Sequence, residues 1–147
     1  MMLEESRSSV VYNAGQDVAT GRYIPEPAYN TAVLTASGST TSTGVAASFA
    51  LPAGARALVL RVVVANEGSS GAVAGWLAAG TTNLHPLFLP SPGVLELKGD
   101  LLSPVAVVNN TTTGALSVSA NILSNSSSNP VAVSINYMIM PDNRPTM

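Results

Sequence analysis

Ala57-Leu58-Val59-Leu60-Arg61-Val62-Val63-Val64 is the stretch that decides the fold of this 147-residue chain. It contains four valines and neither Gly nor Pro, a composition typical of a β-strand. Side chains alternate between the two faces of a strand, so one face is wholly apolar: Leu58, Leu60, Val62 and Val64. The other face is apolar except for one charge: Ala57, Val59, Arg61 and Val63. The pattern predicts a central strand, buried in a sandwich or against a neighbouring subunit.

Further short segments on both sides of this stretch have apolar residues at every second position. Strands are predicted over residues 45–51, 72–78, 94–98, 101–108, 116–122 and 131–140, and a loop with an extended centre at 87–89 is predicted over 81–92. A short helix over 72–78 is the alternative, and Gly71, Gly75 and Gly80 argue against it. Turns rich in Gly, Pro, Asn and Ser separate the strands, and no convincing amphipathic helix interrupts them. The series predicts an all-β fold, a jelly-roll-like two-sheet β-sandwich over residues 45–141, with a C-terminal tail over 142–147. An immunoglobulin domain is disfavoured because its Cys–Trp–Cys spacing needs cysteine, and the chain has none.

The first quarter of the chain has a different character. Residues 1–36 keep no helical or strand period, and Ile24-Pro25-Glu26-Pro27 must be extended because each proline restricts the residue before it. The same region holds three of the four tyrosines. We predict an extended N-terminal arm over 1–36, docked on a partner or a neighbouring copy, or folded back on its own domain. Residues 37–44, SGSTTSTG, are predicted to be a flexible hinge between the arm and the sandwich.

The chain is unusually poor in charge. Charged residues make up 10% of it, where soluble domains carry roughly 25%. Either hydroxyl and amide groups solvate the surface, or much of the surface lies against other subunits. The net charge is −2 and the six basic residues are scattered, which argues against a nucleic-acid partner.

Membrane insertion and secretion are also disfavoured. No apolar run approaches the roughly 20 residues of a membrane helix. The acidic start, MMLEESR, does not have the pattern of a secretory signal. We therefore expect no membrane partner and synthesis in a host cytoplasm.

Catalytic chemistry has little support in the sequence. His85 is the only histidine, stands in front of Pro86 and has no acidic neighbour, so we do not predict a catalytic base. Without cysteine, and with scattered carboxylates, we expect no metal site and no cofactor. Gly68, Gly71 and Gly75 lack the Lys-Ser or Lys-Thr that would end a phosphate loop, and they are better explained as turns. We predict that the protein is not an enzyme.

The sequence suggests specific positions in the fold for two residues, Arg61 and Trp76. Arg61 interrupts an apolar strand, so Val59, Arg61 and Val63 could form a subunit seam, with Glu96 as a partner if Arg61 is buried. Trp76, the only tryptophan, is favoured as a core residue because Val73 and Leu77 are close to it. The alternative is an exposed platform on which a sugar ring stacks.

One resemblance covers the whole chain. An arm containing Tyr23-Ile24-Pro25-Glu26-Pro27, a Ser/Thr/Gly hinge and a small, charge-poor, cysteine-free sandwich resemble the head-decoration, or cement, proteins of tailed bacteriophages. The resemblance implies a structural virion protein, often a homotrimer, that binds the major capsid protein and reinforces the outside of the phage head. The expected localisation is the outer surface of the capsid. Tyr12, Tyr23, Ile24, Pro25 and Tyr29 are the expected anchors of the arm.

A second function remains open at this point. The chain could be a carbohydrate- or receptor-binding β-sandwich module of a tail fibre or spike. That function predicts aromatic side chains presented to solvent, with Trp76 or Phe88 as candidates.

Overall fold

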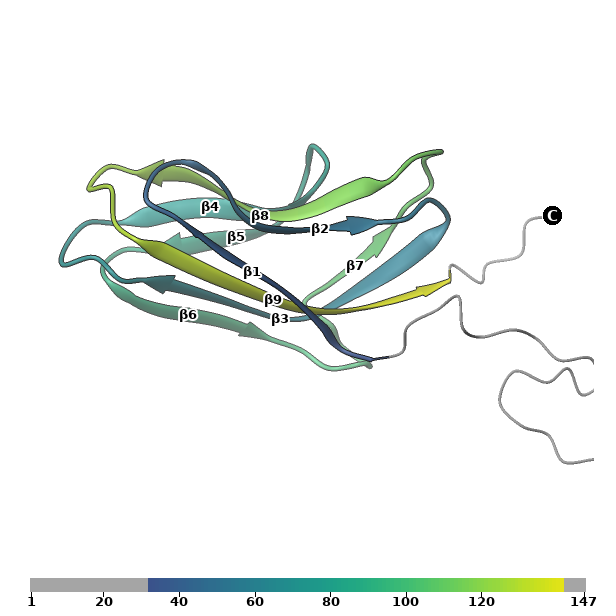
Figure 1. The fold of residues 1–147 in the computed structure, drawn as a ribbon. Coiled ribbons are helices and arrows are strands. Elements are labelled where there is room, and N and C mark those ends of the chain that lie inside the picture. The colour runs from purple at the N-terminus through teal and green to yellow at the C-terminus, as the bar shows by residue number, and fades with distance from the viewer. Residues whose placement is uncertain (1–31, 142–147) are drawn as a thin grey trace, which may run out of the picture. The chain divides into compact units, whose positions relative to one another are not determined.

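The computed structural model describes residues 32–141 and folds them into nine β-strands, with no helix in that range. The strands are β1 (Leu34–Thr40), β2 (Gly44–Leu51), β3 (Ala55–Asn66), β4 (Val73–Ala79), β5 (Thr82–Leu89), β6 (Gly93–Lys98), β7 (Ala106–Asn109), β8 (Leu116–Asn125) and β9 (Val131–Pro141). They form two antiparallel sheets packed face to face (Figure 1). The prediction of an all-β sandwich is confirmed.

The order of the strands is that of a jelly roll. One sheet runs β1-β9-β3-β6, with the short β7 also paired to β3, and the other runs β2-β8-β4-β5. If β7 is left out and the other eight strands are renumbered, the two orders become 1-8-3-6 and 2-7-4-5. Neighbours in each sheet are therefore mostly distant in sequence, as expected for a double-sheet jelly roll. In almost every pair of neighbouring strands, the two strands come from parts of the chain that are far apart in sequence.

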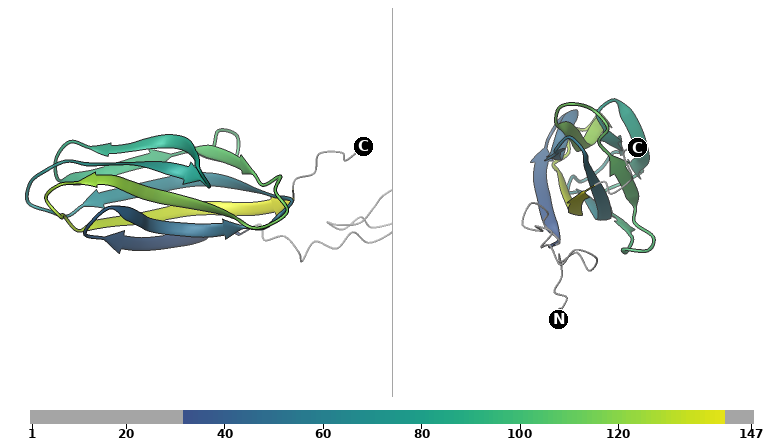
Figure 2. Two further views of the ribbon diagram at one scale, coloured as in Figure 1. Left: turned by 90° about the horizontal axis from the view of Figure 1, so that it is seen from above. Right: turned by 90° about the vertical axis from the view of Figure 1, so that its right-hand side faces the viewer.

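The two sheets lie one over the other when the sandwich is seen from two further sides (Figure 2), and the buried side chains of the core come from both of them. The prediction for the last strand is confirmed, because Val131, Val133, Ile135 and Tyr137 are buried at every second position. Tyr137 on β9 stacks on Phe49 of β2, with ring centroids 3.6 Å apart and planes within 3° of parallel. This stack joins one sheet to the other. It is the only aromatic pair among the residues described.

The strand β3 differs from the prediction because it contains a bulge. Val59 pairs with Tyr137 and Arg61 with Asn136, which leaves Leu60 without a partner on β9. The extra residue reverses the alternation. Ala57 and Val59 point inward before the bulge, and Val62 and Val64 point inward after it. The prediction that Leu58 and Leu60 share a buried face with Val62 and Val64 was wrong, because both leucines are only half-buried.

The bulge is also where β3 changes its partner. Residues Arg61–Asn66 pair with β6, whereas Arg56–Val59 pair with β7. The connection between β6 and β7 is hydrogen-bonded to the bulge, from Gly99 N to Leu60 O (2.8 Å) and from Val105 N to Val59 O (2.8 Å). The predicted strand over 101–108 is therefore reduced to Ala106–Asn109, preceded by a turn.

The hinge predicted over residues 37–44 was wrong. Residues up to Thr40 belong to β1, and Gly44 already begins β2. Gly38 is needed for packing, because a Cβ atom there would lie 2.1 Å from the carbonyl oxygen of Ala46 on β2. The Ser and Thr residues that suggested a linker therefore form an ordered edge strand and its tight turn. The sandwich begins at Leu34 rather than at residue 45.

The rest of the predicted arm cannot be compared with the fold. Residues 1–31 and 142–147 lie outside the described residues, and so do the predicted anchors Tyr12, Tyr23, Ile24, Pro25 and Tyr29.

Candidate functional site

The outer face of the β2-β8-β4-β5 sheet carries no charge. None of these four strands contains Asp, Glu, Lys or Arg. A row of side chains crosses all four strands, because Val45 pairs with Asn121, Asn121 with Trp76, and Trp76 with Pro86. We call the outer side of this sheet, with Val45, Trp76, Pro86, Phe88, Asn121 and Leu123, the neutral face.

Large apolar side chains on the neutral face are open to solvent. Val45 and Phe88 are each 57% exposed and Leu123 is 56% exposed. Two bulges help to present them, one at Val45/Ala47 on β2 and one on β8 opposite Ala74/Gly75, where Leu123 lies between the paired residues. Trp76 is half-buried. The prediction that Trp76 is a core residue was therefore wrong, since the buried neighbours Val73 and Leu77 point to the other side of β4.

The opposite side of the sandwich carries the charges. Arg56 and Arg61 lie on β3 and Glu96 and Lys98 on β6, and within residues 32–141 only Glu67 and Asp100, both outside strands, complete the set. Among the described residues, no charged side chain lies on the β2-β8-β4-β5 sheet. The two outer faces of the sandwich therefore differ in chemistry, although both belong to one small domain.

The three residues predicted as a subunit seam do not share a face. Val59 is 0% exposed and lies between the sheets, because it precedes the bulge on β3. Arg61 and Val63 lie on the outer face of the charged sheet, where Arg61 Nε donates to Glu96 Oε2 at 2.5 Å. Val63 borders a shallow hollow of about 420 Å³, lined mostly by small residues: Ser37, Gly38, Ser39, Ala132, Val133 and Ser134. The expected partner of Arg61 is thus found, but in an exposed pair.

The Arg61–Glu96 ion pair on the outer face of β3 and β6 can be tested in solution. The hydrogen bond and the positive charge of Arg61 hold the pKa of Glu96 below its ordinary value. Because the folded-state pKa is lowered, the stabilisation is present at neutral pH and is lost as the pH falls through that pKa. Arg61→Ala is expected to raise the pKa of Glu96 toward its ordinary value with little change in stability, because exposed pairs contribute little. NMR titration of the Glu96 side chain measures this shift, and an unchanged pKa would show that the pair does not form in solution.

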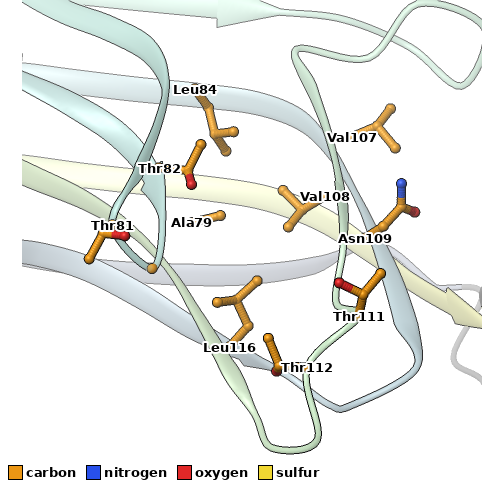
Figure 3. Close-up of a pocket in the computed structure, with 11 residues that line it drawn as sticks. Ala79, Thr81, Thr82, Leu84, Val107, Val108, Asn109, Thr111, Thr112 and Leu116 are labelled. Carbon is orange, nitrogen blue, oxygen red and sulfur yellow. The ribbon is translucent and has the colours of Figure 1, made fainter.

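A pocket opens between the two sheets at one end of the sandwich (Figure 3). Its volume is about 520 Å³. Ala79, Val108 and Leu116 turn toward a common space, and threonines from the β4–β5 turn and the β7–β8 connection surround it (Figure 3). We call this hollow the end pocket; it is lined by Ala79, Gly80, Thr81, Thr82, Leu84, Val107, Val108, Asn109, Thr111, Thr112 and Leu116. No lining residue is charged, and the volume lies within the range of roughly 300–1,000 Å³ that suits small ligands or inserted side chains.

Asn110 holds the loop beside the end pocket. It is 1% exposed, and its Nδ2 atom donates to the carbonyl oxygens of Leu51 and Gly114, both at 2.8 Å. Its Oδ1 atom accepts hydrogen bonds from the backbone N (3.0 Å) and the Oγ1 (2.6 Å) of Thr112. The sequence indicated only a polar turn here. A buried asparagine in a polar turn has no distinguishing sequence signal, because its role depends on the distant Leu51 carbonyl.

The side chain of His85 is hydrogen-bonded to the backbone of its own strand. His85 lies on β5, and its Nδ1 atom donates to the carbonyl oxygen of Pro86 at 2.8 Å. The part of the chain from 32 to 141 contains no group of three or more His, Asp and Glu side chains that could hold a metal ion.

The glycines of residues 68–75 do not form a phosphate loop. A Cβ atom on Gly68 would lie 2.0 Å from Oδ1 of Asn129, so this turn is packed against the chain rather than open to a ligand. Asn129 in turn donates to the carbonyl oxygen of Ser70 at 2.7 Å. Gly75 lies within β4. The interpretation of these glycines as turn residues therefore applies to Gly68 and Gly71 only.

Comparisons with known proteins found no match for this chain. No family model, no curated protein and no solved structure matches it. Residues 32–141 include no helix of the length and apolar character needed to cross a bilayer. The arguments about function therefore rest on the neutral face, the charged face and the end pocket.

Proposed function

We propose that this chain is a structural virion protein, a capsid decoration or cement protein that binds and reinforces the outside of a phage head. The observation that carries the proposal is the neutral face, an uncharged sheet surface with Val45, Phe88 and Leu123 exposed. Contiguous exposed apolar surface on a soluble domain is typical of a protein-binding site. A decoration protein needs such a surface and needs no catalytic group.

The area of the neutral face is about half of what one partner buries in a stable protein–protein interface. Four strands about 4.8 Å apart and seven residues long, with a rise of about 3.3 Å per residue, cover roughly 450 Å². A stable interface buries about 800 Å² on each partner. The remaining area would come from the N-terminal arm, with Tyr12, Tyr23 and Tyr29 as its expected contacts. In this proposal the arm and the neutral face bind the major capsid protein together, and a homotrimer is the favoured oligomer.

Binding to shells tests the proposal. The full-length protein is mixed with phage heads that lack decoration and is sedimented. We expect saturable binding, and a loss of at least about tenfold in affinity for a Phe88→Ser/Leu123→Ser double variant, because two exposed apolar contacts are removed. Val94→Ser is the matched control, since Val94 is 66% exposed on β6 in the other sheet.

Each result of the shell-binding experiment has its own interpretation. Circular dichroism and thermal melting establish that each variant is folded. Equal binding of the double variant and the wild type would show that the neutral face does not contact the shell. Absence of any binding by the wild type to heads of its own virus would overturn the decoration proposal itself.

A second candidate function has its own supporting observation. Trp76 and Phe88 lie on adjacent strands of the neutral face, since Ala74 pairs with Phe88 and Trp76 with Pro86. Half-exposed aromatic rings on an uncharged sheet can stack on sugar rings, as a carbohydrate- or receptor-binding module of a tail fibre or spike requires. A glycan array distinguishes the two functions. A specific glycan signal that Trp76→Ala abolishes would favour the second.

A further inference from the structure

Asn121 places a polar amide in the middle of the neutral face. It lies on β8, an inner strand of its sheet, between Val45 on β2 and Trp76 on β4. Its neighbours along the strand, Ala120 and Ile122, are both 0% exposed, so the side chain of Asn121 points outward. The amide is half-buried in the isolated domain and remains accessible to a partner.

Apolar side chains surround this amide on three sides. Val45 and Trp76 lie beside it in the same row, and Leu123 follows two residues later on β8. Val45 and Leu123 are both more than half exposed. A partner that covered these three residues would exclude water from Asn121 as well, and the pairing of the amide would then decide part of the affinity.

The amide of Asn121 has no hydrogen-bond partner among residues 32–141. Asn136 occupies the matching position on β9, an inner strand of the other sheet, and its Nδ2 atom donates to Thr35 Oγ1 at 2.8 Å. A side-chain amide offers two donors and one acceptor, which water satisfies while the face is free. A wholly apolar partner would leave the amide of Asn121 buried and unpaired, which is costly.

The neutral face also restricts the charge of its partner. None of its four strands contains Asp, Glu, Lys or Arg. A charged group pressed against this face would lose its water without gaining an opposite charge, and the cost would exceed what one amide returns. The face therefore favours a partner surface that is itself uncharged.

We propose that Asn121 is the specificity-determining residue of the neutral face, and that the shell protein presents to it an uncharged apolar patch with a hydrogen-bonding group opposite the amide. This inference rests on the proposed decoration function and names the chemistry of the partner. An apolar patch without the hydrogen-bonding group is rejected, because it leaves the amide unpaired. Protein is favoured over sugar as the partner because two of the three flanking residues, Val45 and Leu123, are aliphatic, whereas sugar rings stack on aromatic ones.

Substitutions of Asn121 in the full-length protein test this role by sedimentation with undecorated phage heads. Asn121→Leu enlarges the apolar area but removes the amide, and we expect it to weaken binding about tenfold. Asn121→Ala, which is too small to obstruct the partner, is expected to show a similar loss. The matched control is Asn136→Leu, the same change on the inner strand of the other sheet, and it should leave the affinity unchanged. Thermal melting establishes that each variant is folded.

A pair of opposite charges tests the neutrality of the partner patch. Leu123→Lys and Leu123→Glu introduce either sign at the same exposed position. We expect both variants to bind heads more weakly than the wild type and by similar factors. Tighter binding of one variant and weaker binding of the other would show that the shell site is charged, which would overturn the proposal.

The remaining results separate this inference from the decoration proposal. Wild-type affinity of Asn121→Leu or Asn121→Ala, with heads that bind the wild type, would overturn the role of Asn121 and leave the decoration proposal standing. Heads that bind no wild-type protein would overturn both. A glycan signal that Asn121→Leu abolishes, without any binding to heads, would also overturn both, in favour of the second candidate function.

Discussion

Replacing Asn110 by alanine is expected to lower the free energy of unfolding by about 3–4 kcal/mol, as judged from the usual cost of leaving buried polar groups unpaired. The substitution removes both donors from the carbonyl oxygens of Leu51 and Gly114 and removes the acceptor of Thr112. The Leu51 bond joins residues 59 positions apart, so its loss separates the β7–β8 connection from the end of β2. Urea unfolding measures the effect as a lower midpoint with an unchanged slope.

Asn109 supplies the matched control for this prediction. Its side chain is exposed and accepts one hydrogen bond, from Arg56 Nε. Asn109→Ala is expected to cost less than about 1 kcal/mol, the usual size of one exposed hydrogen bond. If Asn110→Ala and Asn109→Ala had equal effects, the role assigned to Asn110 would be wrong.

Replacing Phe49 by alanine is expected to cost about 3–5 kcal/mol, the range measured for buried aromatic residues in protein cores. Phe49 stacks on Tyr137 with ring centroids 3.6 Å apart, and this contact joins β2 of one sheet to β9 of the other. The substitution would leave a cavity between the sheets, and the second ring would lose its partner. Thermal and urea unfolding both measure the loss.

The other phenylalanine of the chain is the control. The chain has two, and Phe88 is 57% exposed on the neutral face. Phe88→Ala is expected to change stability by less than about 0.5 kcal/mol, as for most surface substitutions. Similar losses for the two variants would contradict the assignment of one ring to the core and the other to the surface.

The alternation of apolar residues predicted the long regular strands well. In β8 and β9 the expected inward residues, such as Val118, Ile122 and Ile135, are buried. In β9, and in β8 up to the bulge at Leu123, the buried apolar side chains keep to one face of the strand. The fold class followed from them, because several half-buried strands without helices can bury their apolar faces only by stacking two sheets.

Bulges and edge positions explain what the pattern missed. The bulge at Leu60 lies where the partner of β3 changes from β7 to β6, and this partner change has no local sequence signal. Residues 82–89 form β5 although they contain Pro86, because β5 is the edge strand of its sheet and one missing donor costs little there. For β3 the deciding partners are remote in sequence, and for β5 the deciding fact is that no strand pairs with its other side.

The neutral face was missed for the same reason. Val45, Asn121, Trp76 and Pro86 come from four separate strands and form one row only because of the jelly-roll order. Of these residues only Trp76 stands out in the sequence, as the single tryptophan, and nothing there connects it with the other three. The absence of charge from residues 44–51, 73–89 and 116–125 was a usable signal, but assigning it to one sheet required the strand order.

The central claim is that the neutral face is the surface that contacts a phage shell. Hydroxyl-radical footprinting, read by mass spectrometry, measures it directly by comparing the free protein with the protein bound to heads. We expect the oxidation rates of Trp76 and Phe88 to fall severalfold on binding, while that of Met138 on the outer face of β9 changes little. Unchanged oxidation of Trp76 and Phe88 in shell-bound protein, or protection of Met138 alone, would contradict the claim.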